Sequence, residues 1–288
     1  KKGDYRNSIK YYTRYLDEEP YSDSAWYNLG IIYNKTGDYH RALEAYDYAL
    51  AINTDNTFAL FNKANILSNL ERYGEAMEVY REFVEEEPES LEGLTYLAEC
   101  YDKTGNEEMA RKYYYEAIEI TPDFPDPWYG LGLLSLTRDK TTEAVTSLRK
   151  AVQLDPDNPD YWFTLGKAYL LLGSHKKAIK CLRETLRIDG YYDEAWIEIG
   201  MIVIMTGSHD TAIRLLEKAR HVSRDLPGLY YILASAYLHA QKTRPALKAL
   251  TEASRLDADL FDDYSVLLPS EMMTPAMKRL FRKKSDRR

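Results

Sequence analysis

The side chains that most often carry metal chemistry are few in this 288-residue chain. His175 and His209 each stand just after a glycine and a serine, which is typical of turn residues. No Cys-x2-Cys or His-x3-His pair, the spacing that a zinc site uses, accompanies them. We therefore predict no metal at any of the five histidines, which are His40, His175, His209, His221 and His239.

The two cysteines and the glycine-rich and acidic stretches also fail to form a chemical motif. Cys100 and Cys181 are far apart in the chain and are predicted to be separate buried thiols, which favours a reducing, cytoplasmic location. Gly130-Leu131-Gly132 lies in a predicted helix without the strand and turn that a phosphate loop needs. The acidic run at 85–89 is expected to be a solvated connection. We predict no catalysis and no cofactor.

A repeat organises the chain instead. All four tryptophans, Trp26, Trp128, Trp162 and Trp196, fit one lattice with a 34-residue period. Four positions after each lattice point the residue is always tiny, which lets a neighbouring helix approach closely: Gly30, Ala64, Ala98, Gly132, Gly166, Gly200 and Ala234. In each repeat, apolar residues at i, i+3, i+4 and i+7 predict a first helix. A second stripe of apolar residues, which begins at an alanine, predicts a second helix. Glycines 37, 105, 173 and 207 suit a left-handed exit between them.

The motif Trp26-Leu29-Gly30-Tyr33-Ala42-Tyr46-Ala49 resembles the tetratricopeptide repeat. The chain is similar to long bacterial arrays of these repeats, particularly those of Bacteroidetes. The resemblance implies an all-α fold, a right-handed superhelix of stacked antiparallel helix pairs. Seven repeats are predicted: 23–56, 57–90, 91–124, 125–158, 159–192, 193–226 and 227–260. Lys63 and Ser135 depart from the pattern. Gly190, Arg224 and Ala258 replace the closing proline, which predicts looser or longer connections there.

The two ends depart from the repeat. Residues 1–22 are predicted to be the second helix of a truncated repeat, part of a longer protein, whose open face could support self-association. Residues 261–288 are predicted to form a C-terminal capping helix and a basic tail, with a short helix starting at Pro275. This segment either caps repeat 7 or is mobile and docks into the groove or onto a partner.

Charge limits the classes of partner. The net charge is −8, and residues 271–288 hold seven basic and two acidic side chains, which leaves −13 on the rest. An acidic body repels phosphate backbones, so nucleic acid is not an expected partner, and the basic tail is expected to be solvated. No apolar run approaches the roughly 18 residues of a membrane helix.

The resemblance implies that one side of each first helix lines a concave binding groove. In the first repeats this side carries asparagines, which can hydrogen-bond a peptide backbone. In the later repeats it is apolar, which indicates either a groove for an apolar segment or burial, with residues 272–281 as the internal candidate. The predicted groove residues are Tyr27, Asn28, Ile31, Phe61, Asn62, Asn65, Tyr96, Tyr129, Leu133, Phe163, Leu170, Ile197, Met201, Met205 and Tyr231.

Repeat 3 offers Glu92, Thr95 and Tyr96 where the resemblance would require basic residues to clamp a terminal carboxylate, so that mode is not expected. We predict a protein-interaction scaffold that holds a peptide or helical segment and has no catalysis of its own. The alternative is a regulatory or substrate-recognition arm of a larger enzyme whose catalytic domain lies outside these residues. The partner is a protein or peptide.

Overall fold

The computed structural model describes residues 4–282, with the side chains of 4–281, and contains 17 helices and no strand in that range. The prediction of an all-α fold is confirmed. The chain divides into two units, unit 1 (Lys1–Leu154) and unit 2 (Asp155–Arg288). Unit 1 contains α1 (Tyr5–Glu18), α2 (Asp23–Lys35), α3 (Tyr39–Ile52), α4 (Thr57–Asn69), α5 (Tyr73–Glu86), α6 (Leu91–Lys103), α7 (Glu107–Ile120), α8 (Pro125–Thr137) and α9 (Thr141–Leu154).

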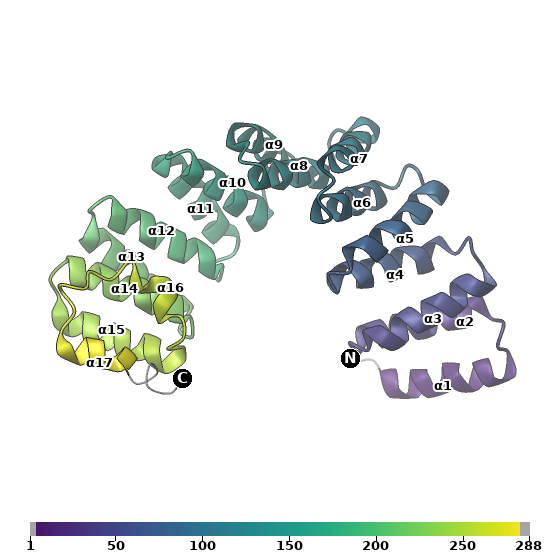
Figure 1. Cartoon of the computed structure of the whole chain (residues 1–288), viewed down its shortest axis with the longest axis horizontal. Coiled ribbons are helices and arrows are strands. Elements are labelled where there is room, and N and C mark those ends of the chain that lie inside the picture. Colours follow the sequence, from purple (N-terminus) through teal and green to yellow (C-terminus); the bar gives the residue numbers. More distant parts are fainter. Residues whose placement is uncertain (1–3, 283–288) are drawn as a thin grey trace. The chain divides into compact units, whose positions relative to one another are not determined.

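Unit 2 continues the same alternation of first and second helices (Figure 1). Its first helices are α10, α12 and α14, and its second helices are α11, α13 and α15. Two short helices, α16 and α17, follow. The bounds are α10 (Pro159–Leu171), α11 (His175–Ile188), α12 (Asp193–Met205), α13 (His209–Val222), α14 (Pro227–His239), α15 (Thr243–Leu256), α16 (Phe261–Ser265) and α17 (Pro275–Arg282).

Close packing within each pair explains the tiny residue of the repeat. A Cβ atom on Gly30 would lie 2.6 Å from Cε1 of Tyr46, and one on Gly200 would lie 2.6 Å from Cδ2 of Leu216. Tyr46 and Leu216 are both fully buried. The first helix can therefore approach its second helix only where its side chain is small.

The connections have a constant length, so the prediction of longer ones in the later repeats is wrong. Four residues separate Ile188 from Asp193 and Val222 from Pro227, as they separate Ile52 from Thr57. The connections before α12 and α14 lack proline but keep the hydrogen bond from the lattice residue that three connections with proline also have. The indole Nε1 of Trp196 donates to the carbonyl of Gly190 (3.0 Å), and the Tyr230 hydroxyl donates to the carbonyl of Arg224 (3.0 Å).

The other tryptophans make the same bond to a carbonyl six residues earlier. Trp26 donates to Pro20 (2.9 Å), Trp128 to Pro122 (3.0 Å) and Trp162 to Pro156 (2.8 Å). Each indole thus holds the connection that precedes its own helix. The tryptophan lattice is a framework feature.

The turn inside each pair uses a left-handed residue. Gly37, Gly105, Gly173 and Gly207 have φ between 66° and 87°, as predicted. Glu71, Asp139 and Gln241 occupy the same position in their pairs with φ of 57° to 58°. These three positions show that the turn is imposed by the packing of the pair, because side chains with a Cβ disfavour this region.

The segment after α15 packs onto the last helix pair. In unit 2, α16 contacts α14, and α17 contacts α15 (Figure 1). Leu268, Met273 and Met277 are buried in the same apolar cluster as α14. The Ser235 hydroxyl donates to the carbonyl of Leu267 at 2.6 Å. The predicted basic tail lies outside the described residues except for Lys278 and Arg279, which are exposed.

None of the helices described between residues 4 and 282 combines the length and the apolar character that crossing a bilayer requires.

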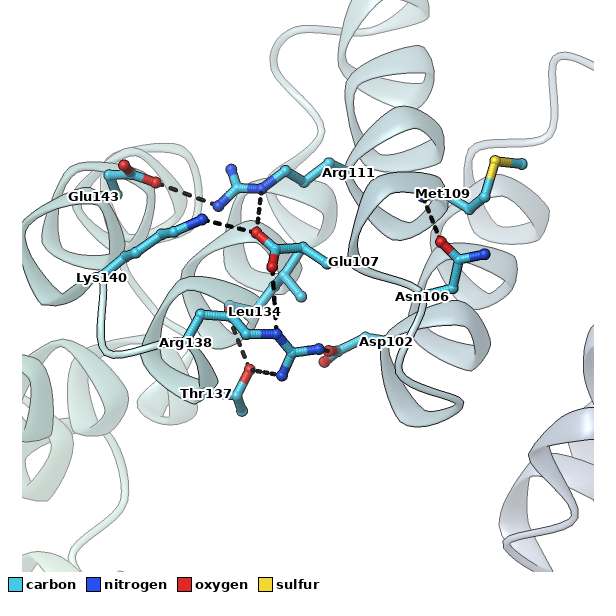
Figure 2. Close-up of polar contacts among 10 residues, drawn as sticks. All are labelled: Asp102, Asn106, Glu107, Met109, Arg111, Leu134, Thr137, Arg138, Lys140 and Glu143. Atoms are coloured by element: carbon cyan, nitrogen blue, oxygen red, sulfur yellow. Dashed lines mark hydrogen bonds and ion pairs between the residues drawn. The ribbon is translucent and has the colours of Figure 1, made fainter.

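A charge network joins Glu107, the first residue of α7, to the end of α8 and the turn between α8 and α9 (Figure 2). Oε1 of Glu107 accepts from Nζ of Lys140 (2.9 Å) and Nε of Arg111 (3.1 Å), and Nε of Arg138 lies 3.4 Å from Oε2. The hydrogen bonds from Lys140 and Arg111 lower the pKa of Glu107 to about 2. The ionised carboxylate is therefore favoured in the folded protein.

This network predicts a pH-dependent contribution to stability. A lowered pKa stabilises the fold above the ordinary value of 4.5, and this contribution is lost as the pH falls towards about 2. We expect Glu107→Gln to flatten the dependence of the free energy of unfolding on pH in that interval, measured by urea denaturation. The control is Glu108→Gln, since Glu108 is exposed and forms no ion pair with a described residue. Equal slopes for the two variants would contradict the assignment.

Candidate functional site

The asparagines predicted to line the groove lie on the first helices of unit 1. Nδ2 of Asn62 in α4 donates to the carbonyl of Phe58 (3.0 Å) and to the hydroxyl of Tyr27 in α2 (3.3 Å). Asn28 is half-buried and has no hydrogen-bond partner among residues 4–281. Asn62 is thus held in place by its neighbours, whereas both the donor and the acceptor of Asn28 are available to a ligand.

A cavity of about 600 Å³, here called the aromatic cavity, opens in unit 1 and is lined in part by α4, the helix that carries Asn62. It is formed by α4, α5, α6 and the turn between α4 and α5. Three of the predicted groove residues, Phe61, Asn65 and Tyr96, line it together. The complete lining is Phe61, Asn65, Ser68, Asn69, Glu71, Tyr73, Tyr80, Tyr96 and Glu99.

Three rings form the walls of the aromatic cavity. The ring centroids of Phe61 and Tyr80 are 6.2 Å apart, those of Phe61 and Tyr96 are 5.9 Å apart, and those of Tyr80 and Tyr96 are 6.0 Å apart. Tyr80 is buried, whereas Tyr96 is 37% exposed at the mouth. The mutual packing of the rings fixes the shape of the cavity without a ligand.

Two polar groups face these rings. The hydroxyl of Tyr80 donates to Oδ1 of Asn65 at 2.5 Å, which orients the amide and leaves its Nδ2 group as a donor. Glu99 is exposed, and partial desolvation raises the pKa of its carboxyl although the charge of nearby Lys103 acts in the opposite direction. A positive ligand group would add to the effect of Lys103 on this carboxylate, because an opposite charge stabilises the ionised form.

The equivalent position in the preceding pair shows how specific this arrangement is. Ile31 of α2 occupies the repeat position of Asn65. The hydroxyl of Tyr46, which corresponds to Tyr80, is buried and has no hydrogen-bond partner in the described residues. The aromatic cavity is therefore a property of the second and third pairs, and not of the repeat as such.

The apolar residues predicted to line the groove differ in exposure. Leu133 of α8 is 36% exposed, and Met205 of α12 is 71% exposed. In unit 2, Phe163, Leu170, Ile197 and Met201 are partly buried against the apolar cluster. Tyr129 and Ile31, in unit 1, are also half-buried.

Tyr231, placed on the groove by the sequence, is not open to a partner in this structure. Its side chain is fully buried, and its ring stacks on Tyr264 with centroids 5.4 Å apart. Phe261 and Phe281 also contact it, and its hydroxyl donates to the carbonyl of Asp257 (3.0 Å). The reason is that the C-terminal segment covers this part of α14. Burial by that segment was one of the two alternatives that the sequence left open.

The remaining candidates for chemistry have structural surroundings. Burial raises the pKa of Cys100 to about 12 and that of Cys181 to about 11, so neither thiol is a strong nucleophile at neutral pH. His209 and His239 stack with centroids 5.0 Å apart. The residues that the structure describes contain no group of three or more His, Cys, Asp or Glu arranged to hold a metal ion.

Sequence reasoning missed the second-helix wall of the aromatic cavity. Tyr73 and Tyr80 come from α5, and the repeat pattern had assigned Tyr80 to the framework. A signal was present in the column that holds Tyr46, Tyr80 and Tyr114 in unit 1 but leucine in the later pairs. Only the structure shows that the Tyr80 hydroxyl reaches Asn65.

Comparison with known proteins bears on the fold. Family models described as TPR repeat and tetratricopeptide repeat match residues 138–173 and 159–192, and the model of the middle TPR-like domain of cilia and flagella-associated protein 70 matches residues 1–121. The general transcriptional corepressor ssn6 of Schizosaccharomyces pombe is 30% identical over 115 residues. This match covers 39% of the chain but only 10% of that relative.

Two solved structures extend the likeness. A tetratricopeptide repeat protein from Parabacteroides merdae is 18% identical, with a TM-score of 0.58 over 98% of this chain and 92% of that one. The structure of YrrB, described as a TPR protein with an unusual peptide-binding site, is 18% identical, with a TM-score of 0.50 over 68% of this chain and 97% of that one. At this identity the likeness concerns the fold alone. The periodic helix pairs, the matching repeat models and these folds together show that the chain contains tetratricopeptide repeats in an all-helical solenoid fold.

Proposed function

We propose that the chain is a protein-interaction scaffold without catalysis of its own, and that unit 1 holds an extended peptide segment along its first helices. The available amide of Asn28 would bind the peptide backbone. A lysine or arginine side chain of the peptide would enter the aromatic cavity. The observation that carries the proposal is the aromatic cavity itself, which is lined by the packed rings of Phe61, Tyr80 and Tyr96 together with Glu99 and the amide of Asn65.

The chemistry of the cavity favours a cation. A guanidinium or ammonium group is attracted to aromatic faces, and more strongly where water is partly excluded. Glu71 and Glu99 add two carboxylates to the lining, and among the described residues no lysine or arginine lines it, although Lys103 is near enough to act on Glu99. Unit 1 as a whole holds 17 basic and 28 acidic residues, so its field also favours a basic segment. YrrB is described as having a peptide-binding site, which supports a peptide as the class of ligand.

The two free cysteines support a proposal about the cellular compartment of the protein. Cys100 and Cys181 are both buried and unpaired among the residues that the structure describes. We include a reducing compartment, the cytoplasm, in the proposal, because thiols of this kind persist there.

The test uses a random peptide library displayed on phage and selected on the intact chain. We expect the selected peptides to share a lysine or arginine at one fixed position. The variant Tyr96→Ala with Glu99→Gln should bind them about tenfold more weakly, since it removes the cation–π and charge contributions. The matched control is Tyr115→Ala with Glu119→Gln, because both residues are exposed on α7 and do not line the cavity.

Thermal unfolding of both variants should show that each remains folded. Selected peptides without a shared basic residue would argue against a cationic ligand. Equal binding by the cavity variant and the control variant would remove the aromatic cavity from the binding site.

A further inference from the structure

A second cavity, of about 720 Å³, opens in unit 2, where residues of α11, α12 and α13 and of the connection between α11 and α12 line it. We call it the cationic cavity. Its base is apolar and includes Trp196 and Leu215. Four cations line the cavity with this base, and none of the carboxylates in the described part of the chain does. The cations are Arg183, Arg187, Arg214 and Lys218.

Three of these cations form no ion pair with a carboxylate among residues 4–281, although the charge of Arg214 acts on Asp210 one helical turn away. Arg183 and Lys218 form no ion pair with any residue between 4 and 281, and the guanidinium of Arg214 donates only to the hydroxyl of Thr211 (3.2 Å). Arg187 differs, because its Nε lies 2.7 Å from Oε2 of Glu184. The fold therefore gathers four positive charges around one opening and pairs only Arg187 directly with carboxylates, and such an excess raises the local concentration of an anionic partner.

The charge of these helices contrasts with that of the second helices in unit 1. Helices α11 and α13 together hold eight lysines and arginines against three acidic residues. Helices α5 and α7 hold three against nine. The net charge of −8 for the whole chain conceals this difference, since it averages over both units.

We propose that the cationic cavity binds an acidic peptide segment that inserts an apolar side chain between the cations. Charge complementarity selects the carboxylates, and the base formed with Trp196 and Leu215 selects the apolar side chain. Nucleic acid or an anionic lipid surface would satisfy the cations, but a phosphate backbone would leave the apolar base unused. This site involves α11, α12 and α13 only, so it is independent of the groove proposed for unit 1.

The test measures fluorescence anisotropy of a labelled peptide made of six glutamates around two central leucines, titrated with the intact chain. We expect binding that Arg183→Glu with Lys218→Glu weakens about tenfold or more, since close charge pairs are replaced by repulsion. The control is Lys176→Glu with Lys180→Glu. It changes the charge equally on the exposed surface of α11, outside the cavity. It should change the affinity by about twofold at most, as expected for exposed charges.

Three results would overturn the proposal. Equal loss of binding in both variants would show that only the overall charge matters. Unchanged affinity when serines replace the two leucines of the peptide would show that the apolar base takes no part. The third is binding of a poly-thymidine oligonucleotide, or of vesicles containing phosphatidylserine, that depends on Arg183 and Lys218 while the peptide does not bind. Such binding would assign the cavity to phosphate ligands.

Discussion

Met277→Ala is expected to lower the free energy of unfolding by about 2–4 kcal/mol, the range for truncating a buried large apolar side chain. Met277 lies in α17 and is fully buried in the cluster that contains α14 and α15. Its loss would leave a cavity between the C-terminal segment and the last helix pair. Chemical denaturation followed by circular dichroism measures the change.

The matched control for this prediction is Met272→Ala. Met272 lies shortly before Met277 in the same segment and is 38% exposed, so its truncation should have a small effect. Similar losses in the two variants would contradict the packing of α17 described above. A loss at Met277 alone would establish that the segment after α15 contributes to the core of unit 2.

Gly130→Asn is expected to destabilise the protein by about 1–3 kcal/mol, the usual cost of overpacking a core. Gly130 in α8 occupies the repeat position of Asn28 and Asn62, but the ring of Tyr114 fills the adjacent space. A Cβ atom on Gly130 would lie 2.3 Å from Cε1 and 2.4 Å from Cζ of this buried ring. Thermal or urea unfolding of the variant measures the effect.

Two further variants test the cause. Gly74→Ala should be neutral or stabilising by up to about 1 kcal/mol, because alanine favours helix and a Cβ there meets no atom within 4 Å. Tyr114→Leu combined with Gly130→Asn should lose less stability than the two single changes added together, because the shorter side chain makes room. Strict additivity would show that the ring is not the obstacle.

The helix pairs follow from the sequence because the repeat has one strict period. The helices begin at Asp23, Thr57, Leu91, Pro125, Pro159, Asp193 and Pro227, which are the predicted starts of the repeats. A residue type that recurs at one position in all seven repeats has similar local surroundings in each repeat. One motif therefore predicts all seven helix pairs. The connections without proline have the same length as the others. In two of them the lattice residue of the following helix, Trp196 or Tyr230, donates a hydrogen bond to the connection, and this residue is part of the motif.

The candidate sites were less predictable because they depend on where the repeats differ. Asn65 was identified from its helix face, but the aromatic cavity also needs Tyr80 from the second helix, which the motif treats as framework. The burial of Tyr231 depends on where a segment outside the period packs. The cationic cavity was not predicted because the net charge was summed over residues 1–270. Such a sum carries no information on the charge of single helices.

The hydrogen bonds of the four indoles make the chain suitable for spectroscopy. Trp26 and Trp128 belong to unit 1, and Trp162 and Trp196 belong to unit 2, so each unit contains two intrinsic fluorophores. Because each indole is bonded to the connection before its helix, solvent entry at that connection would shift its emission to longer wavelengths. Leucine and tyrosine already occupy the other lattice positions, so they are natural replacements for single-tryptophan variants. Such variants would report the order in which the helix pairs open, without an attached dye.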